Sequence, residues 1–372
     1  MLPTLVFLLA GWSPLTSTEA PPIVVASPDE PARAESPKAE APARRFRPRL
    51  KGLNPRPSYR PNDPTRPTVC LIHGINSTSG SFVHLAPLLE RQGYGVVLYD
   101  YPYNQELSQT IPAFIESLKS FRNEHNDAQP WSILCHSMGA LLARSYVEGP
   151  NYNSDVASLI LIGPPNAGSA LAPAQDILQV LEAIRASIDP EGRTLMVLGE
   201  QISAAAKDLS PGSRFLSRLA RSRPREGVPY YILAGDVGFL SREVRETIEA
   251  RYRQVQRRAG FLGGLAGLAL RNLPDVLDVL TEGTGDGAVA VASTRLEGAT
   301  EHVVIPVNHV ELIRGPLFYP EPGPVACEPF VSRWLAESLP ITSLTEVKPD
   351  SQTDVESQTK TEAPVEIGGN GS

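Results

Sequence analysis

A serine stands where an apolar strand pattern gives way to a helical pattern. Residues 135–139 read Cys-His-Ser-Met-Gly, directly after the apolar run 131–135, and the helical pattern follows at once. On a sharp strand-to-helix turn, a serine hydroxyl is exposed at the C-terminal edge of a sheet, above a helix N-terminus whose dipole favours developing negative charge. The turn needs small side chains nearby: Gly139 fits, and Cys135 replaces the glycine expected on the strand side. This pattern predicts that Ser137 is the nucleophile of an acyl-transfer reaction.

The chain around this serine alternates short strands with helices. From residue 68 onward, runs rich in Val, Ile and Leu alternate with amphipathic stretches, which is typical of a mostly parallel sheet with crossover helices. The predicted strands are 68–72, 95–99, 131–135, 157–162, 230–234, 287–292 and 303–307. The predicted helices among them are 82–92, 107–124 and 138–147. The predicted fold class is α/β, with a mostly parallel sheet, helices on both faces, and helical cap insertions at about 171–225 and 237–282.

Six short motifs follow one another along the chain. They are Leu-Ile-His-Gly-Ile at 71–75, the turn at Ser137, Pro-Pro-Asn-Ala-Gly-Ser at 164–169, Leu-Ser-Pro-Gly-Ser at 209–213, Gly-Asp-Gly at 285–287 and Asn-His-Val at 308–310. In these motifs and their order, the chain resembles the α/β-hydrolase superfamily, and within it the bacterial lipases and lipase-like serine esterases. The resemblance implies the α/β-hydrolase fold and a catalytic triad in the chain order serine, acid, histidine.

The base of such a triad must come late in the chain. Of the six histidines, His302 and His309 satisfy this order. His302 precedes the predicted strand 303–307 and would lie at the wrong end of it, whereas His309 follows the strand and emerges at the edge where Ser137 emerges. We therefore expect His309 to be the base. His73 is expected to be a buried structural histidine bonded to its own loop.

Two aspartates follow strand patterns and could orient this base. Asp236 comes directly after one strand pattern, and Asp286 stands in the stretch Gly-Asp-Gly-Ala-Val. The resemblance favours Asp286, because lipase-like sequences place the acid in an Asp-Gly-x-Val stretch shortly before the histidine. Asp236 is the alternative acid, and the aspartate that is not used would cap its own turn.

The resemblance also implies where a developing oxyanion would be bound. The backbone N–H of Met138, directly after the nucleophile, is one expected donor, and the N–H of Ile75, in the family's donor position, is the other. We predict a serine hydrolase, a lipase or esterase, that cleaves carboxylic esters through an acyl-enzyme intermediate. The alternatives are amidase, thioesterase or acyltransferase chemistry on the same triad, and an inactive binding module. No cofactor is expected, because the chemistry of such a triad needs none. No metal site is expected either, since the three cysteines form neither a disulfide framework nor a metal motif.

Apolar stripes in the two insertions indicate where the acyl chain would bind. One stripe comprises Ile177, Leu178, Val180, Leu181 and Ile184, and the other lies within 261–270. Such stripes either form the core of the cap or contact a lipid surface, so the expected partners are an acyl-ester or lipid substrate and, transiently, a lipid interface. The net charge of -7 excludes nucleic acid as a general partner, because phosphate neutralisation needs a basic surface. The sequence does not indicate an oligomeric state.

Both ends of the chain have compositions that cannot build a core. Residues 1–67 hold 14 of the 36 prolines, and 341–372 is rich in acidic and hydroxyl residues, which leaves one domain at 68–340. Residues 1–20 are predicted to be a signal peptide, which favours export. The alternatives are a retained anchor and a misassigned start codon. If the stretch is not a signal, the cytoplasm is favoured. Residues 21–67 are predicted to be a Pro/Ala/Arg-rich disordered linker, and 341–372 an acidic disordered tail. The basic run in the linker is interpreted as a solvated arm, with a lipid- or nucleic-acid-binding patch as the alternative.

Overall fold

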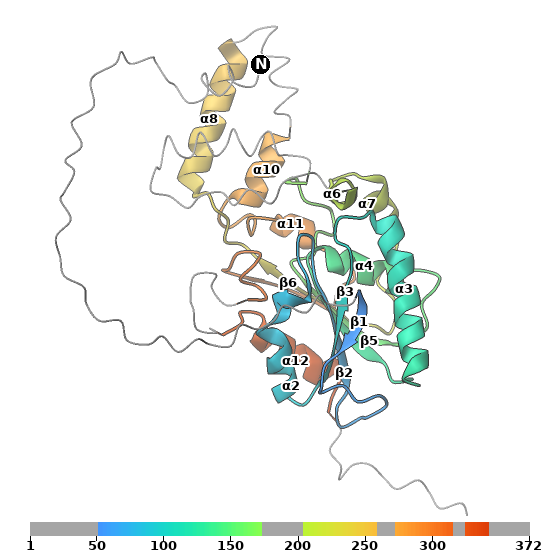
Figure 1. The fold of residues 1–372 in the computed structure, drawn as a ribbon. Helices are drawn as coiled ribbons and strands as arrows, with labels where there is room; N and C mark the ends of the chain where they lie inside the picture. Colours follow the sequence, from blue (N-terminus) through green and yellow to red (C-terminus); the bar gives the residue numbers. More distant parts are fainter. Residues whose placement is uncertain (1–50, 173–203, 259–271, 315–323, 342–372) are drawn as a thin grey trace, which may run out of the picture. The chain divides into compact units, whose positions relative to one another are not determined.

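A seven-stranded sheet forms the centre of the computed structural model, which describes residues 51–172, 204–258, 272–314 and 324–341. The strand order is β1-β3-β2-β4-β5-β6-β7; β1 is antiparallel to β3, and all other neighbours are parallel. The strands are β1 (Gly52–Pro55), β2 (Thr68–Ile72), β3 (Gly95–Asp100), β4 (Trp131–His136), β5 (Val156–Ile162), β6 (Tyr230–Gly235) and β7 (Glu301–Ile305) (Figure 1). The predicted α/β class with a mostly parallel sheet is confirmed.

Helices cover both faces of this sheet, which is why its central strands are apolar at nearly every position. Along β2, Cys70 and Ile72 pack into the hydrophobic cluster on one face, while Val69 and Leu71 pack into the cluster on the other. The first cluster includes side chains of α3 and α4, and the second includes side chains of α2 and α12. These helices are α2 (Leu85–Arg91), α3 (Leu107–Glu124), α4 (Met138–Val147) and α12 (Glu328–Ser338), with a 3-10 turn, η1 (Ser79–Phe82), before α2.

The first strand forms inside the stretch predicted to be a disordered linker. β1 pairs with β3 at the edge of the sheet, and the chain after it is held by hydrogen bonds from Arg56 N to Val96 O (2.9 Å) and from the Tyr59 hydroxyl to Asp127 (2.8 Å). Arg56 also forms a 2.6 Å ion pair with Glu90, so this part of the basic run is not a solvated arm. Residues 52–67 belong to the domain, because a proline-rich composition still permits a short edge strand.

The predicted strand at 287–292 does not form. Gly285 makes an isolated bridge with Ala290, and a short helix, α11 (Val291–Thr294), follows. The reason is a side chain: one carboxylate oxygen of Asp286 accepts hydrogen bonds from the N–H groups of Ala288 and Val289, at 3.0 and 2.7 Å, which turns the backbone instead of extending it.

Helical segments follow β5 and β6, in the two ranges where cap insertions are predicted. α6 (Ala204–Leu209) and α7 (Arg214–Leu219) precede β6, whereas α8 (Arg242–Arg258) and α10 (Leu273–Leu280) precede β7. Side chains of α8 and α10 form a third hydrophobic cluster, separate from the two on the sheet. The apolar stripes at 177–184 and 261–270 lie outside the described residues.

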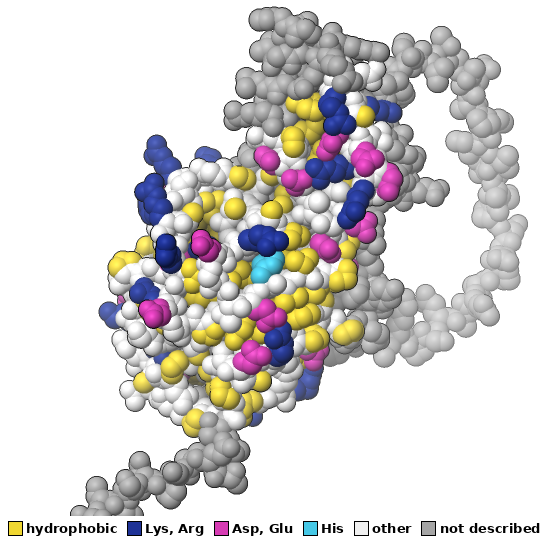
Figure 2. All heavy atoms as spheres, turned by 180° about the vertical axis from the view of Figure 1, so that it is seen from behind, with side chains coloured by type: hydrophobic (Ala, Val, Ile, Leu, Met, Phe, Trp, Pro, Cys, Tyr) yellow, Lys and Arg dark blue, Asp and Glu magenta, His cyan; other side chains and the backbone are white. Residues whose placement is uncertain are grey.

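The predictions for the two ends of the chain also fall largely outside the described residues, which include neither 1–50 nor 342–372. Within the described residues, no helix is long and apolar enough to cross a membrane, and no group of three or more His, Cys, Asp or Glu side chains could hold a metal ion. Cys70, Cys135 and Cys327 are free and buried. Figure 2 shows acidic and basic side chains interspersed with hydrophobic ones over most of the described surface on one face of the molecule.

Candidate active site

Ser137 stands on the tight turn between β4 and α4. Its backbone lies in the left-handed region at φ 54° and ψ -126°, and its N–H donates to Ile162 O at 2.8 Å. A non-glycine residue at positive φ is strained, and such strain is held in place only where the surroundings are well packed. Gly139 provides part of that packing, because a side chain there would come within 2.7 Å of Ile72 O and 2.6 Å of His73 O. The small residue expected after the serine is therefore required by close contact with the end of β2.

His309 and Asp286 form a hydrogen-bonded pair beside this turn. His309 Nδ1 lies 2.7 Å from Asp286 Oδ2, and the His309 N–H donates to the Asp286 carbonyl at 2.9 Å. Asp286 is 1% exposed, and its second carboxylate oxygen accepts the two N–H groups of its own turn. Because a carboxylate only accepts, Nδ1 carries the proton in this bond and Nε2 is left for other partners.

The alternative acid occupies a different position. Asp236 is held through its backbone: its N–H donates to Ile305 O at 3.2 Å, and its carbonyl accepts from Gly283 N at 2.7 Å. The carboxylate that contacts His309 belongs to Asp286. His302 lies within β7, and its Nε2 is 2.8 Å from the Thr294 hydroxyl, so the structure gives it a structural partner.

His136 is a contact of His309 that the sequence reasoning missed. Its Nε2 lies 3.0 Å from the carbonyl oxygen of His309, and the two rings are 4.6 Å apart. Burial, and secondarily the proximity of His309, lower the pKa of His136 well below 6.5, so the ring is neutral and donates through Nε2. A polar residue at the last position of a buried strand was the only sequence signal for this role.

Two further contacts in this region were not predicted from the sequence. Gly163, at φ +57°, lies under the His309 ring, where a Cβ would approach the ring carbon Cε1 to 2.8 Å. The Ser169 hydroxyl donates to Ala288 O at 2.6 Å and so ties the loop after β5 to the loop that carries Asp286. The loop after β5 therefore contacts His309 through Gly163 and the loop of Asp286 through Ser169.

The two expected oxyanion donors belong to the residue after Ser137 and to the loop that passes Ser137. Ile75 follows Gly74, and a Cβ on Gly74 would meet the Cβ of Ser137 at 2.8 Å, so the loop after β2 runs directly along the serine. Met138 is the first residue of α4, where N–H groups have no partner within the helix. Neither of these two N–H groups has a hydrogen-bond partner among the described residues.

A cavity of about 300 Å³ brings the predicted residues together. Ser137, Asp286, His309 and Ile75 all line it. Much of the remaining wall is apolar and comes from the segments after β5 and β6; it includes Leu171, Ala172, Ala206, Leu209 and Phe239. A polar cluster therefore faces an apolar chamber, as in sites that take an apolar ligand with one reactive group.

Comparison with known proteins agrees with this architecture. A family model for the α/β-hydrolase fold matches residues 67–201. Together with the sheet order and the turn at Ser137, this match shows that the chain has the α/β-hydrolase fold. No curated protein sequence matches the chain.

Several solved structures of bacterial or environmental origin are similar. They include a lipase of Bacillus licheniformis, BlEst2 in its mature form (19% identity, TM-score 0.49, covering 75% of this chain and 97% of that one). A metagenomic carboxyl esterase, MGS0156, has 18% identity and a TM-score of 0.43 over 80% of this chain and 81% of that one. The phospholipase PlaB of Legionella pneumophila has 18% identity and a TM-score of 0.41, over 61% of this chain and 45% of that one.

Proposed function

We propose that this protein is a serine hydrolase that cleaves carboxylic esters of apolar acyl groups. The observation that carries the proposal is the hydrogen-bonded pair His309–Asp286, 2.7 Å apart, in the cavity that Ser137 lines. A buried carboxylate that orients an imidazole beside a serine on a strained turn is the arrangement that activates a serine as a nucleophile.

In the proposed reaction, the first half forms an acyl-enzyme. His309 Nε2 takes the proton of the Ser137 hydroxyl as its oxygen attacks the carbonyl carbon of the ester. The resulting tetrahedral oxyanion accepts hydrogen bonds from the N–H groups of Ile75 and Met138. When the intermediate collapses, His309 gives the proton to the leaving alcohol, and the acyl group stays on Ser137.

The second half uses water in place of the serine hydroxyl. His309 takes a proton from water, the hydroxide adds to the acyl carbon, and collapse returns the proton to Ser137 and releases the carboxylic acid. Throughout, Asp286 stabilises the charged imidazolium and keeps the ring in the tautomer that presents Nε2. The apolar walls at Leu171, Leu209 and Phe239 would take the hydrocarbon part of the acyl group.

A fluorophosphonate probe tests the nucleophile, and a matched substrate set tests the reaction class. The probe should label wild-type protein on Ser137, as read by mass spectrometry of the modified peptide, and hydrolysis should be lost in proportion to labelling. An ester, a thioester and an anilide of the same acyl group should then be compared by kcat/KM, with the ester the best. A folded protein that is not labelled would contradict the proposal, and a preference for the anilide or the thioester would replace the ester by that class.

A further inference from the structure

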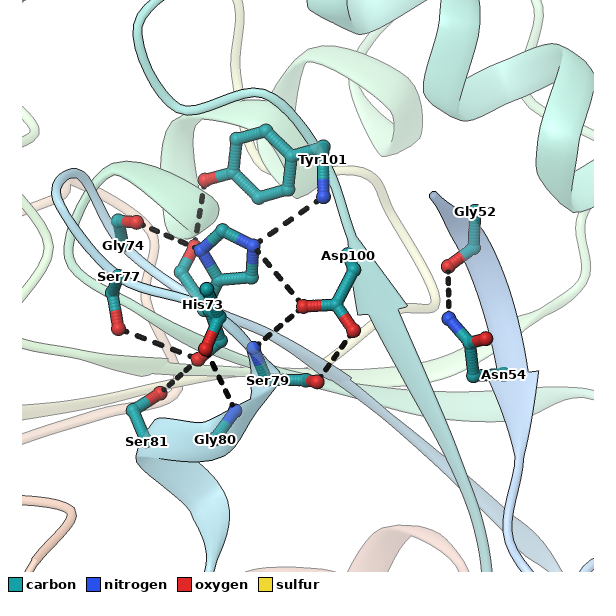
Figure 3. Close-up of polar contacts among 11 residues, drawn as sticks. Gly52, Asn54, His73, Gly74, Ser77, Ser79, Gly80, Ser81, Asp100 and Tyr101 are labelled. Atoms are coloured by element: carbon teal, nitrogen blue, oxygen red, sulfur yellow. Dashed lines mark hydrogen bonds and ion pairs between the residues drawn. The ribbon is translucent and has the colours of Figure 1, made fainter. Parts of the chain in front are cut away.

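The loop that carries Ile75 is held by a compact network of polar contacts around His73. Figure 3 shows His73 between Gly74 on one side and Tyr101 and Asp100 on the other. His73 Nδ1 lies 2.8 Å from Gly74 O, and Nε2 lies 3.4 Å from the backbone nitrogen of Tyr101. The Tyr101 ring stacks on the His73 ring at 4.3 Å, and its hydroxyl donates to His73 O at 2.6 Å.

These contacts define which nitrogen of His73 carries the proton. A carbonyl oxygen can only accept, so Nδ1 must carry the proton that it donates to Gly74 O. A backbone N–H can only donate, so Nε2 must accept from Tyr101. One neutral tautomer of His73 satisfies both bonds, and the 3.8 Å contact between Nε2 and Asp100 is then not a salt bridge.

The bond to Gly74 O has a consequence for Ile75, because both belong to one peptide unit. A trans peptide is planar, and its C=O and N–H groups point in opposite directions. His73 is 1% exposed and does not line the cavity, whereas Ile75 does. When the carbonyl of this unit points inward at His73, the N–H of Ile75 points the other way, away from the interior that holds His73.

We propose that His73 is the positioning residue of the oxyanion donor: by holding Gly74 O through Nδ1, it fixes the peptide plane that aims the Ile75 N–H. This inference rests on the proposed function and assigns to His73 a part in the reaction, although its side chain does not touch the substrate. The hydrogen bond from His73 matters more because it acts on Gly74, since a residue without Cβ restrains the rotation of its flanking peptides less than any other.

The far end of the same loop is fixed by the neighbour of Tyr101. Asp100, at the end of β3, accepts from the N–H of Ser79 at 2.7 Å and from its hydroxyl at 2.5 Å (Figure 3). Two consecutive residues, Asp100 and Tyr101, therefore hold the two ends of the loop, one through Ser79 and the other through His73. This leaves the Gly74–Ile75 peptide as the part whose orientation depends on the His73 side chain.

Three substitutions separate this role from simple packing. Asn places an amide nitrogen where His has Nδ1, so His73→Asn can still donate to Gly74 O. Gln places its amide nearer the position of Nε2, so His73→Gln loses that bond but keeps a polar group near Tyr101. His73→Leu removes both polar positions at similar volume.

The expected result is a loss that follows the Gly74 bond. Loss of a whole oxyanion donor costs roughly a hundred- to thousandfold in kcat, so a misdirected donor should lower kcat of the Leu and Gln variants by about ten- to a hundredfold. KM should change little, because the interaction is made in the transition state. The affinity for a trifluoromethyl ketone, which places an oxyanion in this position after adding to the serine, should fall with kcat. His73→Asn should stay within a few-fold of wild type in both.

Thermal unfolding of each variant separates positioning from stability. If His73 only supports the fold, Asn and Leu should lower the melting temperature and activity together, and Asn should not restore kcat; that outcome overturns the inference. Wild-type activity in a folded Leu variant would overturn it as well. If the fluorophosphonate does not label the wild-type protein, the proposed function is wrong. That result is distinct from equal activities in the wild type and the three variants, which would overturn the inference about His73.

Discussion

The sheet and the cap bury apolar side chains in different ways, and the difference separates two tasks of the site. Helices cover both faces of the sheet, and the groups proposed to react emerge from its strand ends, where Asp286 is hydrogen-bonded to His309 and to its own turn. The cap helices α8 and α10 share a small apolar cluster and are joined at the surface by the ion pair Arg245–Asp278. The cap-side walls of the cavity are apolar.

This contrast suggests that the sheet determines the rate of the chemical step and the cap determines which acyl group fits. Rigid strand ends can keep reacting groups in place to within fractions of an ångström, which catalysis requires. A small helical cluster can change its lining residues without disturbing these groups. Substitutions in the two regions should therefore affect different kinetic constants.

The largest effect is expected from the proposed nucleophile and the proposed base. Ser137→Ala should lower kcat by on the order of a millionfold while the protein stays folded, since the groups of a triad act as a unit. His309→Ala should behave similarly. Circular dichroism and ester turnover with purified variants check this. If folded Ser137→Ala kept more than about a tenth of the wild-type activity, the chemical step would not belong to this serine.

The two aspartates give the next largest effect and a matched control. Removing the orienting carboxylate costs about ten-thousandfold in kcat in a well-studied protease. Asp286→Asn should therefore lose far more activity than Asp236→Asn, because only Asp286 is bonded to His309 Nδ1. Steady-state kinetics of both variants decide the matter. The reverse order would move the acid to Asp236.

The cap should determine the preference for acyl length. Each methylene group moved from water into an apolar pocket is worth about 0.8 kcal/mol, so octanoate should exceed butyrate by roughly a hundredfold in kcat/KM. Leu171→Ala, which shortens a wall residue, should reduce this ratio by about tenfold and leave acetate turnover nearly unchanged. Nitrophenyl esters below their micelle concentrations provide the measurement.

The matched control for this prediction is Leu280→Ala. Leu280 is buried in the cap cluster but does not line the cavity, so its loss should lower stability without changing the octanoate-to-butyrate ratio. A flat chain-length series in the wild type, or equal ratios for both leucine variants, would show that the cap does not select the acyl chain.

The smallest expected effect concerns His136 and the pH dependence of stability. The folded protein holds the pKa of this histidine well below 6.5, so below that pH the unfolded chain takes up a proton that the folded chain does not. This lowers the free energy of unfolding as the pH falls, by at most about 1.4 kcal/mol per pH unit. His136→Gln keeps a donor for His309 O but cannot titrate, so it should lose less stability between pH 6.5 and 5 in urea unfolding. Parallel curves for the two proteins would exclude this role.

The residues that the sequence indicates for the site are those whose place in the fold depends on strand ends. Ser137, Asp286 and His309 each follow an apolar run or a turn motif, and all three line one cavity in the structure. The supporting contacts could not be predicted in this way. His136, Gly163 and Ser169 act through distances between segments that are far apart in the chain, and neither periodicity nor local propensity contains that information.

The errors in the fold had local causes. Residues 287–292 have the apolar pattern of a strand, but the Asp286 side chain binds the following N–H groups and forms a turn. The proline-rich composition around β1 did not indicate a strand. β1 still pairs with β3, because this pairing uses backbone groups that every residue except proline can donate. In both cases, hydrogen bonds to the backbone determined a local structure that differs from the one predicted from composition.

The order of the strands also determines when, during synthesis of the chain, the proposed active site would be complete. The serine turn lies between β4 and α4, and its strand neighbours β2 and β5 leave the ribosome early. Asp286 and His309 follow β6 and flank β7, the edge strand that pairs last in chain order. A nascent or truncated chain would carry Ser137 without the proposed acid and base, and under the proposed function it would be inactive. The time at which a fluorophosphonate begins to label the chain would then report when the last strand, β7, pairs with the sheet.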